Sequence, residues 1–281
     1  MKTRRTMLAA LLASVPVLAL AGSSGCVVTQ DQSTPVDAKL VTEPETGRRY
    51  WLYVPSEYGP ARPWPLVVTL HGAGPWDSSE DQIREWKHLA EQHGLIVAAP
   101  ALNSASLTRI RRGAWLADLR GDERAVLAVV AHVTSSYTIA EVARPAPTTA
   151  PTTKPARVRR HILLTGFLEG GYALYAIGLK HAGRFGALIA RDCYFDGDAI
   201  DADAIGPETR QTPMLIGNGK DGSMAISGWL FSRGQAWEAY GYLRANGCAR
   251  AERKEYRGGQ LRRPARAYEF WRPHLPKALR R

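Results

Sequence analysis

Apolar and polar positions alternate along most of the chain in two patterns, which predict two kinds of element. Residues 66–70 and 95–100 are short, continuous apolar runs of the length expected for buried strands. Between them, Ser78 or Ser79 can cap a helix over residues 80–93 that Gly94 can end. The same patterns predict further strands at 48–55, 161–165, 186–190, 212–217 and 251–256, and further helices at 121–135, 172–182, 235–245 and 265–274.

This order of elements predicts an α/β fold with a mostly parallel, doubly wound sheet that helices cover on both faces. Residues 101–120 are expected to form an irregular loop, and the polar run at 251–256 indicates a strand near an edge of the sheet. Because the carboxyl ends of parallel strands share one rim, the turns that follow strands should meet there. These turns are residues 71–74, 166–171, 191–195, 217–222 and 258–260.

The first 25 residues have the pattern of a secretory signal. Basic residues near the start precede an apolar run at 7–21, which is short for a membrane span. We therefore expect an exported protein with a signal at 1–25, a tether at 27–38 and one domain at 39–281.

Small residues lead up to Cys26 and resemble a bacterial lipobox, in which the cysteine is lipidated and becomes the mature N-terminus. Ser23 stands where leucine is usual in that motif. Simple signal cleavage nearby is the alternative. The expected location is the bacterial cell envelope, either anchored in the membrane through Cys26 or periplasmic or secreted.

A tract rich in proline, threonine and alanine occupies residues 143–157. Such a composition cannot bury a core. Because strand and helix patterns continue beyond it, we expect an exposed loop insertion within the domain rather than a domain boundary.

The formal net charge is +11, and basic residues cluster at 109–112, 157–160, 262–266 and 280–281. A basic surface could bind anionic lipid headgroups, acidic polysaccharide or nucleic acid, whereas solvated arginines are the plainer interpretation. No nucleic-acid-binding motif accompanies the charge, so we expect no nucleic-acid partner.

The sequence Gly-Phe-Leu-Glu-Gly-Gly at 166–171 lies between a predicted strand and a predicted helix. A glycine-flanked turn in that setting is typical of a nucleophile elbow, G-x-S-x-G, which holds a serine above the sheet. Leu168 stands at the serine's position, and it has neither a lone pair to attack with nor a proton to give. Glu169 is displaced by one residue, and its side chain is expected to point away from the position of an elbow serine.

The segment His71-Gly72-Ala73-Gly74 directly follows a buried apolar run and resembles the HGGG-type loop that donates to an oxyanion. Glycines let the backbone approach a substrate closely. The second donor of such an oxyanion site would be the backbone N–H of Glu169. An ordinary tight turn between strand and helix is the alternative interpretation.

Five stretches of the sequence match motifs of one protein superfamily: residues 49–55, 64–72, 166–172, 178–185 and 267–271. In this order, over residues 40–275, they resemble the α/β-hydrolase superfamily, and within it secreted esterases of the polyhydroxybutyrate depolymerase and feruloyl esterase type. The resemblance implies an α/β-hydrolase fold and serine ester hydrolase chemistry. It also implies a serine at the elbow, an aspartate after the next-to-last strand and a histidine before the closing helix.

Gln260 falls at the position of that histidine, and a glutamine amide cannot act as a base near neutral pH. Asp221 is one residue early, so it is either a relic of the orienting acid or an ordinary turn aspartate. With Leu168 at the elbow, these positions predict a catalytically impaired homologue that binds a ligand in the old cleft or a partner at the envelope. An active carboxylic ester hydrolase that uses a rearranged site is the alternative.

Cys193 and Cys248 are the cysteines that remain if Cys26 is lipidated, and in an exported protein they could form a disulfide. Cys193 could also be a thiol nucleophile, although no histidine is evident nearby. The seven histidines and the acidic patch at 192–203 match no metal-ligand spacing, and no phosphate-binding glycine loop occurs. We therefore expect no metal and no cofactor, and the patterns give no oligomeric state.

Overall fold

The computed structural model describes residues 38–106, 112–143, 158–220, 226–257, 262 and 264–281. Within these ranges the main sheet has eight strands. The order across the sheet is β1 (Lys39–Thr42), β2 (Arg49–Tyr53), β4 (Ile96–Pro100), β3 (Leu66–Leu70), β7 (Ile162–Phe167), β8 (Ala187–Arg191), β9 (Met214–Gly219) and β10 (Ala251–Tyr256). In this order the neighbouring strands from β4 to β10 are parallel, whereas β1 and β2 are antiparallel to their neighbours. The predicted mostly parallel sheet is confirmed, with the polar strand at its edge.

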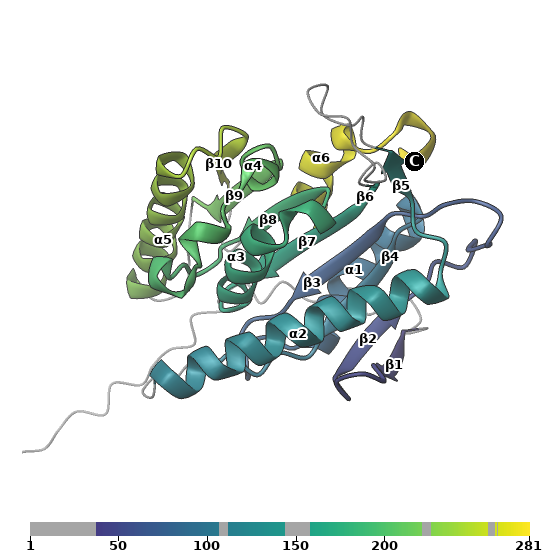
Figure 1. Cartoon of the computed structure of the whole chain (residues 1–281), viewed down its shortest axis with the longest axis horizontal. Helices are drawn as coiled ribbons and strands as arrows, with labels where there is room; N and C mark the ends of the chain where they lie inside the picture. The colour runs from purple at the N-terminus through teal and green to yellow at the C-terminus, as the bar shows by residue number, and fades with distance from the viewer. Residues whose placement is uncertain (1–37, 107–111, 144–157, 221–225, 258–261, 263) are drawn as a thin grey trace, which may run out of the picture.

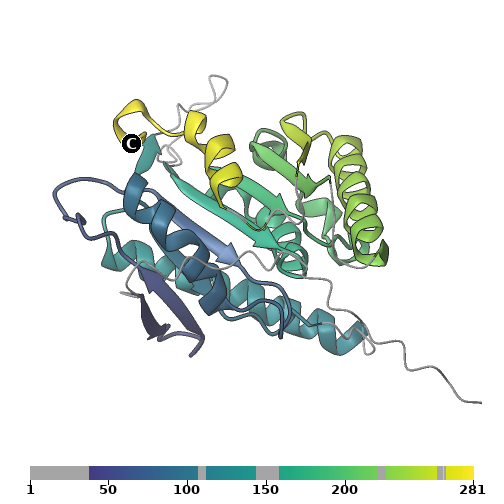
Figure 2. The same ribbon diagram turned by 180° about the vertical axis from the view of Figure 1, so that it is seen from behind.

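Helices cover both faces of the sheet, as predicted (Figures 1 and 2). One face carries α2 (Arg112–Ser136), α3 (Gly170–Lys180) and α5 (Ile226–Ala245), and the other carries α1 (Ser79–His93) and α6 (Ala265–Trp271). The shorter elements are α4 (Pro207–Arg210) and five 3₁₀ turns, Ala182–Arg184, Gly197–Ala199, Ala202–Ala204, Arg272–His274 and Lys277–Leu279.

Side chains along the buried strands point alternately to the two faces of the sheet, and the core is therefore divided into two clusters. In β3, Leu66, Val68 and Leu70 pack in the cluster under α2 and α3, whereas Val67 packs in the cluster under α1 and α6. Successive side chains of a strand point to opposite faces, so a fully apolar strand of this kind must be covered twice. That requirement explains why continuous apolar runs in the sequence correspond to central strands.

The predicted ends of α1 are confirmed. Ser78 accepts a hydrogen bond from the backbone N–H of Asp81 at 3.2 Å, which caps the helix N-terminus. Gly94 ends the helix in the left-handed conformation with φ 64°.

The predicted irregular loop at 101–120 is wrong in its second half, because α2 begins at Arg112 and not near residue 121. Trp115 and Leu119 are buried on one side of this extension, and the indole Nε1 of Trp115 donates to the Ser104 carbonyl at 3.1 Å. Burial of these side chains outweighs the low helix propensity of the glycines at 113 and 121. Helix α5 likewise starts earlier than residue 235, at Ile226.

The flanks of the proline- and threonine-rich tract pair with each other. Strand β5 (Glu141–Ala143) runs antiparallel to β6 (Val158–Arg160), with Ala143 opposite Val158. Residues 144–157, like residues 1–37 with the predicted signal, Cys26 and nearly all of the tether, lie outside the described residues. In the part of the chain that the structure describes, no helix has both the length and the apolar character needed to cross a membrane.

Candidate active site

The turn at 166–171 has the backbone of a nucleophile elbow. It joins β7 to α3, and Leu168 at its apex adopts φ 45°, a left-handed conformation that non-glycine residues rarely adopt. The Leu168 carbonyl accepts hydrogen bonds from the backbone N–H groups of Gly171 at 3.0 Å and Tyr194 at 2.9 Å. A residue keeps a strained backbone conformation of this kind only where the surrounding structure holds it in place. Here the strained residue is an almost buried leucine, 7% exposed.

Two glycines let the elbow pack against its neighbours. A Cβ on Gly170 would lie 2.4 Å from the Leu70 carbonyl oxygen, and a Cβ on Gly171 would lie 2.4 Å from the Tyr194 carbonyl oxygen. Both clashes are with backbone, which cannot rotate away. The elbow is therefore fixed between the end of β3 and the loop after β8, and the scaffold that would hold a serine is intact.

The loop after β3 lies directly beside the elbow, as predicted. A Cβ on Gly72 would lie 3.2 Å from the Cβ of Leu168. His71 serves this loop structurally, because its Nε2 accepts from the backbone N–H of Leu102 at 2.8 Å. Its other ring nitrogen, Nδ1, lies 2.6 Å from the Gly72 carbonyl and therefore carries the donating proton. With both nitrogens engaged, His71 has no free position from which to act as a base.

Carboxylates bind the two N–H groups at the centre of this loop. The backbone N–H of Ala73 donates to Oε2 of Glu169 at 2.8 Å, and the N–H of Gly72 donates to Oδ2 of Asp77 at 2.7 Å. Glu169 is 5% exposed and Asp77 is 2% exposed. The expectation that the Glu169 side chain points away from the elbow position is wrong, because its carboxylate and the Leu168 Cβ both face Gly72. A long side chain can fold back, and here it satisfies a buried donor.

Gln260 and Asp221, the predicted positions of the base and the acid, lie outside the described residues. Two described residues close to them in the sequence, Lys220 and Arg262, have defined contacts. The Arg262 guanidinium lies 5.0 Å from the Phe167 ring centroid and donates to Oδ1 of Asp77 at 2.8 Å. The backbone N–H of Lys220 donates to the Tyr256 carbonyl at 2.7 Å. Arg262 therefore lies beside the elbow.

A buried polar group that the sequence analysis did not find lies beneath the loop, and we call it the charged cluster. Its members are Asp77, Gln82, Glu85, Arg191 and Arg262. The Arg191 guanidinium is completely buried and donates to Oε1 of the Gln82 side chain and to the backbone carbonyl of Arg262 at 2.6 Å. It also donates to Oγ1 of two strand threonines, Thr69 at 3.1 Å and Thr165 at 3.2 Å.

Glu85 has the most perturbed carboxyl of the charged cluster. Burial raises its pKa to about 7, although the neighbouring guanidinium groups of Arg191 and Arg262 act in the opposite direction. Two signals in the sequence could have indicated the cluster. Arg191 ends an otherwise apolar strand, and Gln82 and Glu85 are three residues apart on a helix whose Trp86 is buried.

The possible disulfide between Cys193 and Cys248 is contradicted, because both thiols are free and buried. Leu188, Met214 and Ala251 are aligned across β8, β9 and β10. Cys193 lies five residues beyond Leu188 and Cys248 lies three residues before Ala251, so they are displaced in opposite directions along the sheet. The three residues from Leu188 to the end of β8 alone span about 10 Å. A disulfide needs Cα atoms within about 7 Å.

Cys193 is also unsuited to nucleophilic attack. Burial raises the pKa of its thiol well above the ordinary value, and the reactive species of a cysteine is the thiolate. The acidic residues near it have structural partners: Asp192 Oδ1 accepts from the Gly219 N–H at 3.0 Å, and Asp196 pairs with Arg112 at 2.9 Å. Among the described residues, no group of three His, Cys, Asp or Glu side chains could hold a metal ion.

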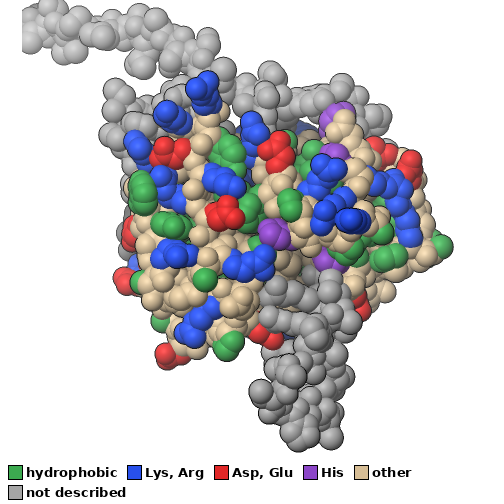
Figure 3. Space-filling model, turned by 90° about the horizontal axis from the view of Figure 1, so that it is seen from above, with side chains coloured by type: hydrophobic (Ala, Val, Ile, Leu, Met, Phe, Trp, Pro, Cys, Tyr) green, Lys and Arg blue, Asp and Glu red, His purple; other side chains and the backbone are tan. Residues whose placement is uncertain are grey.

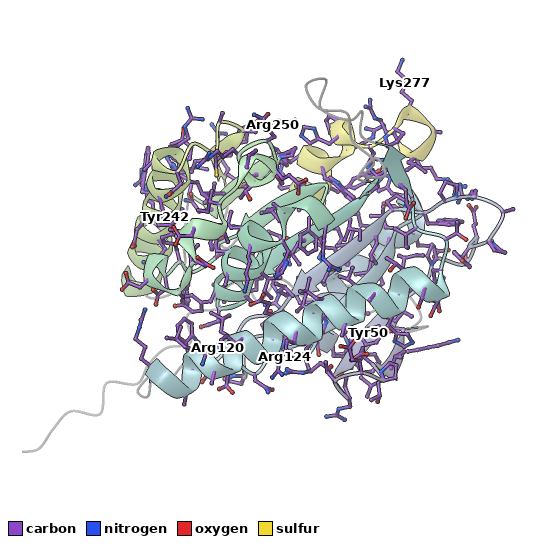
Figure 4. All side chains as sticks on the ribbon, in the orientation of Figure 1. Tyr50, Arg120, Arg124, Tyr242, Arg250 and Lys277 are labelled. Carbon is purple, nitrogen blue, oxygen red and sulfur yellow. The ribbon has the colours of Figure 1, made fainter. Side chains whose placement is uncertain are left out.

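Basic side chains are spread over the molecule. Figure 3 shows lysines and arginines interspersed with acidic residues on one face. In Figure 4, Arg120 and Arg124 project from α2, far from Arg250 and Lys277. Four arginines of the predicted basic clusters have acidic partners within the chain: Arg112 with Asp196, Arg262 with Asp77, Arg266 with Glu269 and Arg281 with Glu57. Arg280 instead donates to the backbone carbonyls of Pro273 and Leu275.

Comparison with known proteins gives no matching family model and no matching curated relative. Solved structures do match. A ferulic acid esterase from Anaeromyces mucronatus aligns with a TM-score of 0.58 at 15% identity, over 83% of this chain and 88% of that one. S-formylglutathione hydrolase from Staphylococcus aureus aligns with a TM-score of 0.51 at 13% identity, over 84% and 93%.

A thermostable esterase aligns with a TM-score of 0.52 at 19% identity, over 83% of this chain, and the alignment spans 59% of the esterase. Identities of this size establish a shared architecture and do not transfer an activity. Together with the parallel sheet, the elbow and the loop after β3, these likenesses show that the chain has the α/β-hydrolase fold.

Proposed function

We propose that this protein is a catalytically impaired relative of the fold's esterases that binds a ligand or a partner protein at the bacterial cell envelope. The observation that carries the proposal is Leu168 at the apex of an otherwise intact elbow, with φ 45°. A serine hydrolase needs a hydroxyl or thiol at this point to form its acyl-enzyme. Leucine can contribute only apolar contact.

No described side chain beside the elbow replaces the missing chemistry. Cys193 is buried with a raised thiol pKa, and both ring nitrogens of His71 are hydrogen-bonded within the loop. Gln260, at the position expected for the base, has an amide that cannot accept a proton near neutral pH. A binding function needs none of these groups.

Two further features support binding at the old cleft. The backbone of the elbow is kept at the expense of a strained leucine, which a purely structural turn would not require. Trp76, on the loop after β3, is 54% exposed and offers a large apolar surface near the elbow. The envelope location rests on the sequence of residues 1–26.

The test is hydrolysis of p-nitrophenyl acetate and butyrate by the full chain, beside the variant Leu168→Ser/Gln260→His. The matched control is Leu168→Ala/Gln260→His, which also removes the leucine but supplies no hydroxyl. We expect no turnover by the native chain or the control. Turnover by the serine variant alone would support the proposal, because it would show that the scaffold is an esterase scaffold that lacks only these catalytic side chains.

Efficient turnover by the native chain would refute the proposal and would favour the alternative, an active carboxylic ester hydrolase with a rearranged site. If all three proteins are inert, the loss of catalysis extends beyond the two substituted positions. The Glu169 carboxylate, which is bound to the Ala73 N–H, is one such further change.

A further inference from the structure

The Glu169 side chain turns away from the helix that follows it. Glu169 is the N-cap residue of α3, and its side chain makes no capping hydrogen bond to that helix. The side chains that ordinarily cap a helix at this position are the shorter ones of serine, threonine, aspartate and asparagine. The Glu169 carboxylate instead crosses to the loop after β3, 96 residues earlier in the chain, and accepts from Ala73.

The atom that Glu169 binds matters because of where it lies. In a hydrolase of this fold, two backbone N–H groups stabilise the oxyanion: one from the loop after β3 and one from the residue after the nucleophile. Within the loop after β3 the Gly72 N–H is bound to Asp77, so we assign the first donor to the N–H of Ala73 and the second to the N–H of Glu169 itself. The Glu169 N–H donates to no group among the described residues, whereas the Ala73 N–H is taken by the Glu169 carboxylate.

A carboxylate at this point opposes catalysis in two ways. Its Oε2 occupies the side of the Ala73 N–H to which a substrate carbonyl oxygen would have to bind. Its negative charge also lies where the transition state develops negative charge. Because Glu169 is only 5% exposed, water screens the repulsion between these two charges weakly. Replacing the nucleophile alone changes neither effect.

We infer that Glu169 is an internal blocking group, whose carboxylate fills the oxyanion site of this fold and closes it to any ligand oxygen. This inference deepens the proposed function, because it adds a second block that is independent of Leu168. It also names the ligand chemistry of the vacated site: a small carboxylate, which has the same two oxygen acceptors as the side chain that it replaces.

The first test does not depend on catalysis. Glu169→Ala and Glu169→Ser are prepared in the otherwise native full chain, and thermal unfolding is followed in sodium acetate and in sodium chloride of equal ionic strength. Serine is included because its short hydroxyl can cap α3 but cannot reach Ala73, which protects folding if the alanine variant is unstable. Glu238→Ala, at an exposed glutamate of α5 whose described contact is Gln235, is the matched control.

We expect acetate to raise the unfolding midpoint of both Glu169 variants and to leave the native chain and Glu238→Ala unchanged relative to chloride. An equal response of all four proteins, or no response in either Glu169 variant, would overturn the inference.

The second test adds Glu169→Ala to Leu168→Ser/Gln260→His. Loss of one oxyanion donor costs on the order of 10²–10³-fold in kcat, so the triple variant should exceed the double variant by about that factor. A double variant as active as the triple would contradict the block while leaving the proposed function standing. If both are inert but acetate still binds the Glu169 variants, the block holds and the proposal that the scaffold is otherwise competent fails.

Discussion

The elbow and the charged cluster are neighbours, but their conformations are maintained by opposite means. The elbow is held by close backbone contacts and by glycines that have no side chain to clash, and it keeps its shape without the serine it would serve. The charged cluster is held by side-chain hydrogen bonds and ion pairs around a completely buried guanidinium. The elbow backbone therefore forms with leucine at its apex, whereas a buried ionic network should tolerate the loss of almost none of its side chains. Four measurements test this contrast.

The largest effect should follow removal of the Arg191 charge. Arg191→Met leaves the Glu85 carboxylate and Oε1 of Gln82 without this buried donor, and breaking such a pair costs about 3–5 kcal/mol of unfolding free energy. Urea denaturation measures the loss. The double variant Arg191→Met/Glu85→Leu removes both charges and should recover part of it. A loss below about 1 kcal/mol for Arg191→Met would show that the network contributes little.

A smaller but still large effect is expected at the elbow from a single added methyl group. In Gly170→Ala the new Cβ would lie 2.4 Å from the Leu70 carbonyl oxygen, and overpacking against backbone costs about 3 kcal/mol. Gly241→Ala in α5 is the control, since a Cβ there meets nothing within 4 Å, and it should gain about 0.5–1 kcal/mol from helix propensity. Equal urea midpoints for the two variants would show that the elbow is adaptable.

The charged cluster should also make stability depend on pH. The pKa of Glu85 is about 7 in the folded chain, above the ordinary 4.5, so the folded state binds this proton more tightly than the unfolded state. The resulting stabilisation is fully present below pH 4.5 and is lost as the pH rises to about 7. Urea midpoints measured from about pH 4.5 to about pH 8 should fall in this window.

Glu85→Gln cannot titrate and should flatten that part of the profile. Glu80→Gln, at a partly exposed glutamate on the same helix, is the matched control and should leave the pH dependence unchanged. The same slope in the native chain and in Glu85→Gln would assign the pH dependence to another group.

The smallest effect should come from an exposed arginine. Arg112 pairs with Asp196 at 2.9 Å, but its side chain is 48% exposed and water can replace the partner. We expect Arg112→Gln to unfold at the same urea concentration as the native chain within error. A loss comparable to that of Arg191→Met would show that burial does not distinguish the two arginines.

The sequence predicts most of the fold because the signals that mark strands, helix ends and the elbow are local. Apolar runs such as 66–70 and 161–165 are long enough to mark the buried strands β3 and β7, and Ser78 and Gly94 mark the ends of α1. The G-x-x-x-G-G pattern likewise gives the elbow and its missing serine. The start of α2 was not predictable in this way, because it depends on burial of Trp115 against Tyr172, whose rings are 5.2 Å apart.

The contacts that decide the chemistry of the site are long-range, and the sequence does not encode them locally. Glu169 binds Ala73 across 96 positions, and Arg191 binds Gln82 across 109. Whether a glutamate caps its own helix or reaches another loop depends on which buried donor lies within the length of its side chain. Such a choice follows from the assembled fold, which is why the position of Glu169 was predicted wrongly.

The contacts on either side of the expected base position limit the search that a protein engineer would need. The Tyr256 carbonyl accepts a hydrogen bond from Lys220, and Arg262 is bonded to Asp77 close to the elbow. A histidine meant to serve a serine introduced by Leu168→Ser is therefore best sought between these two residues, Tyr256 and Arg262, in the sequence. A library that places one histidine at each of these positions in turn, combined with a few alternative residues at position 169, samples these designs in a single multiwell plate.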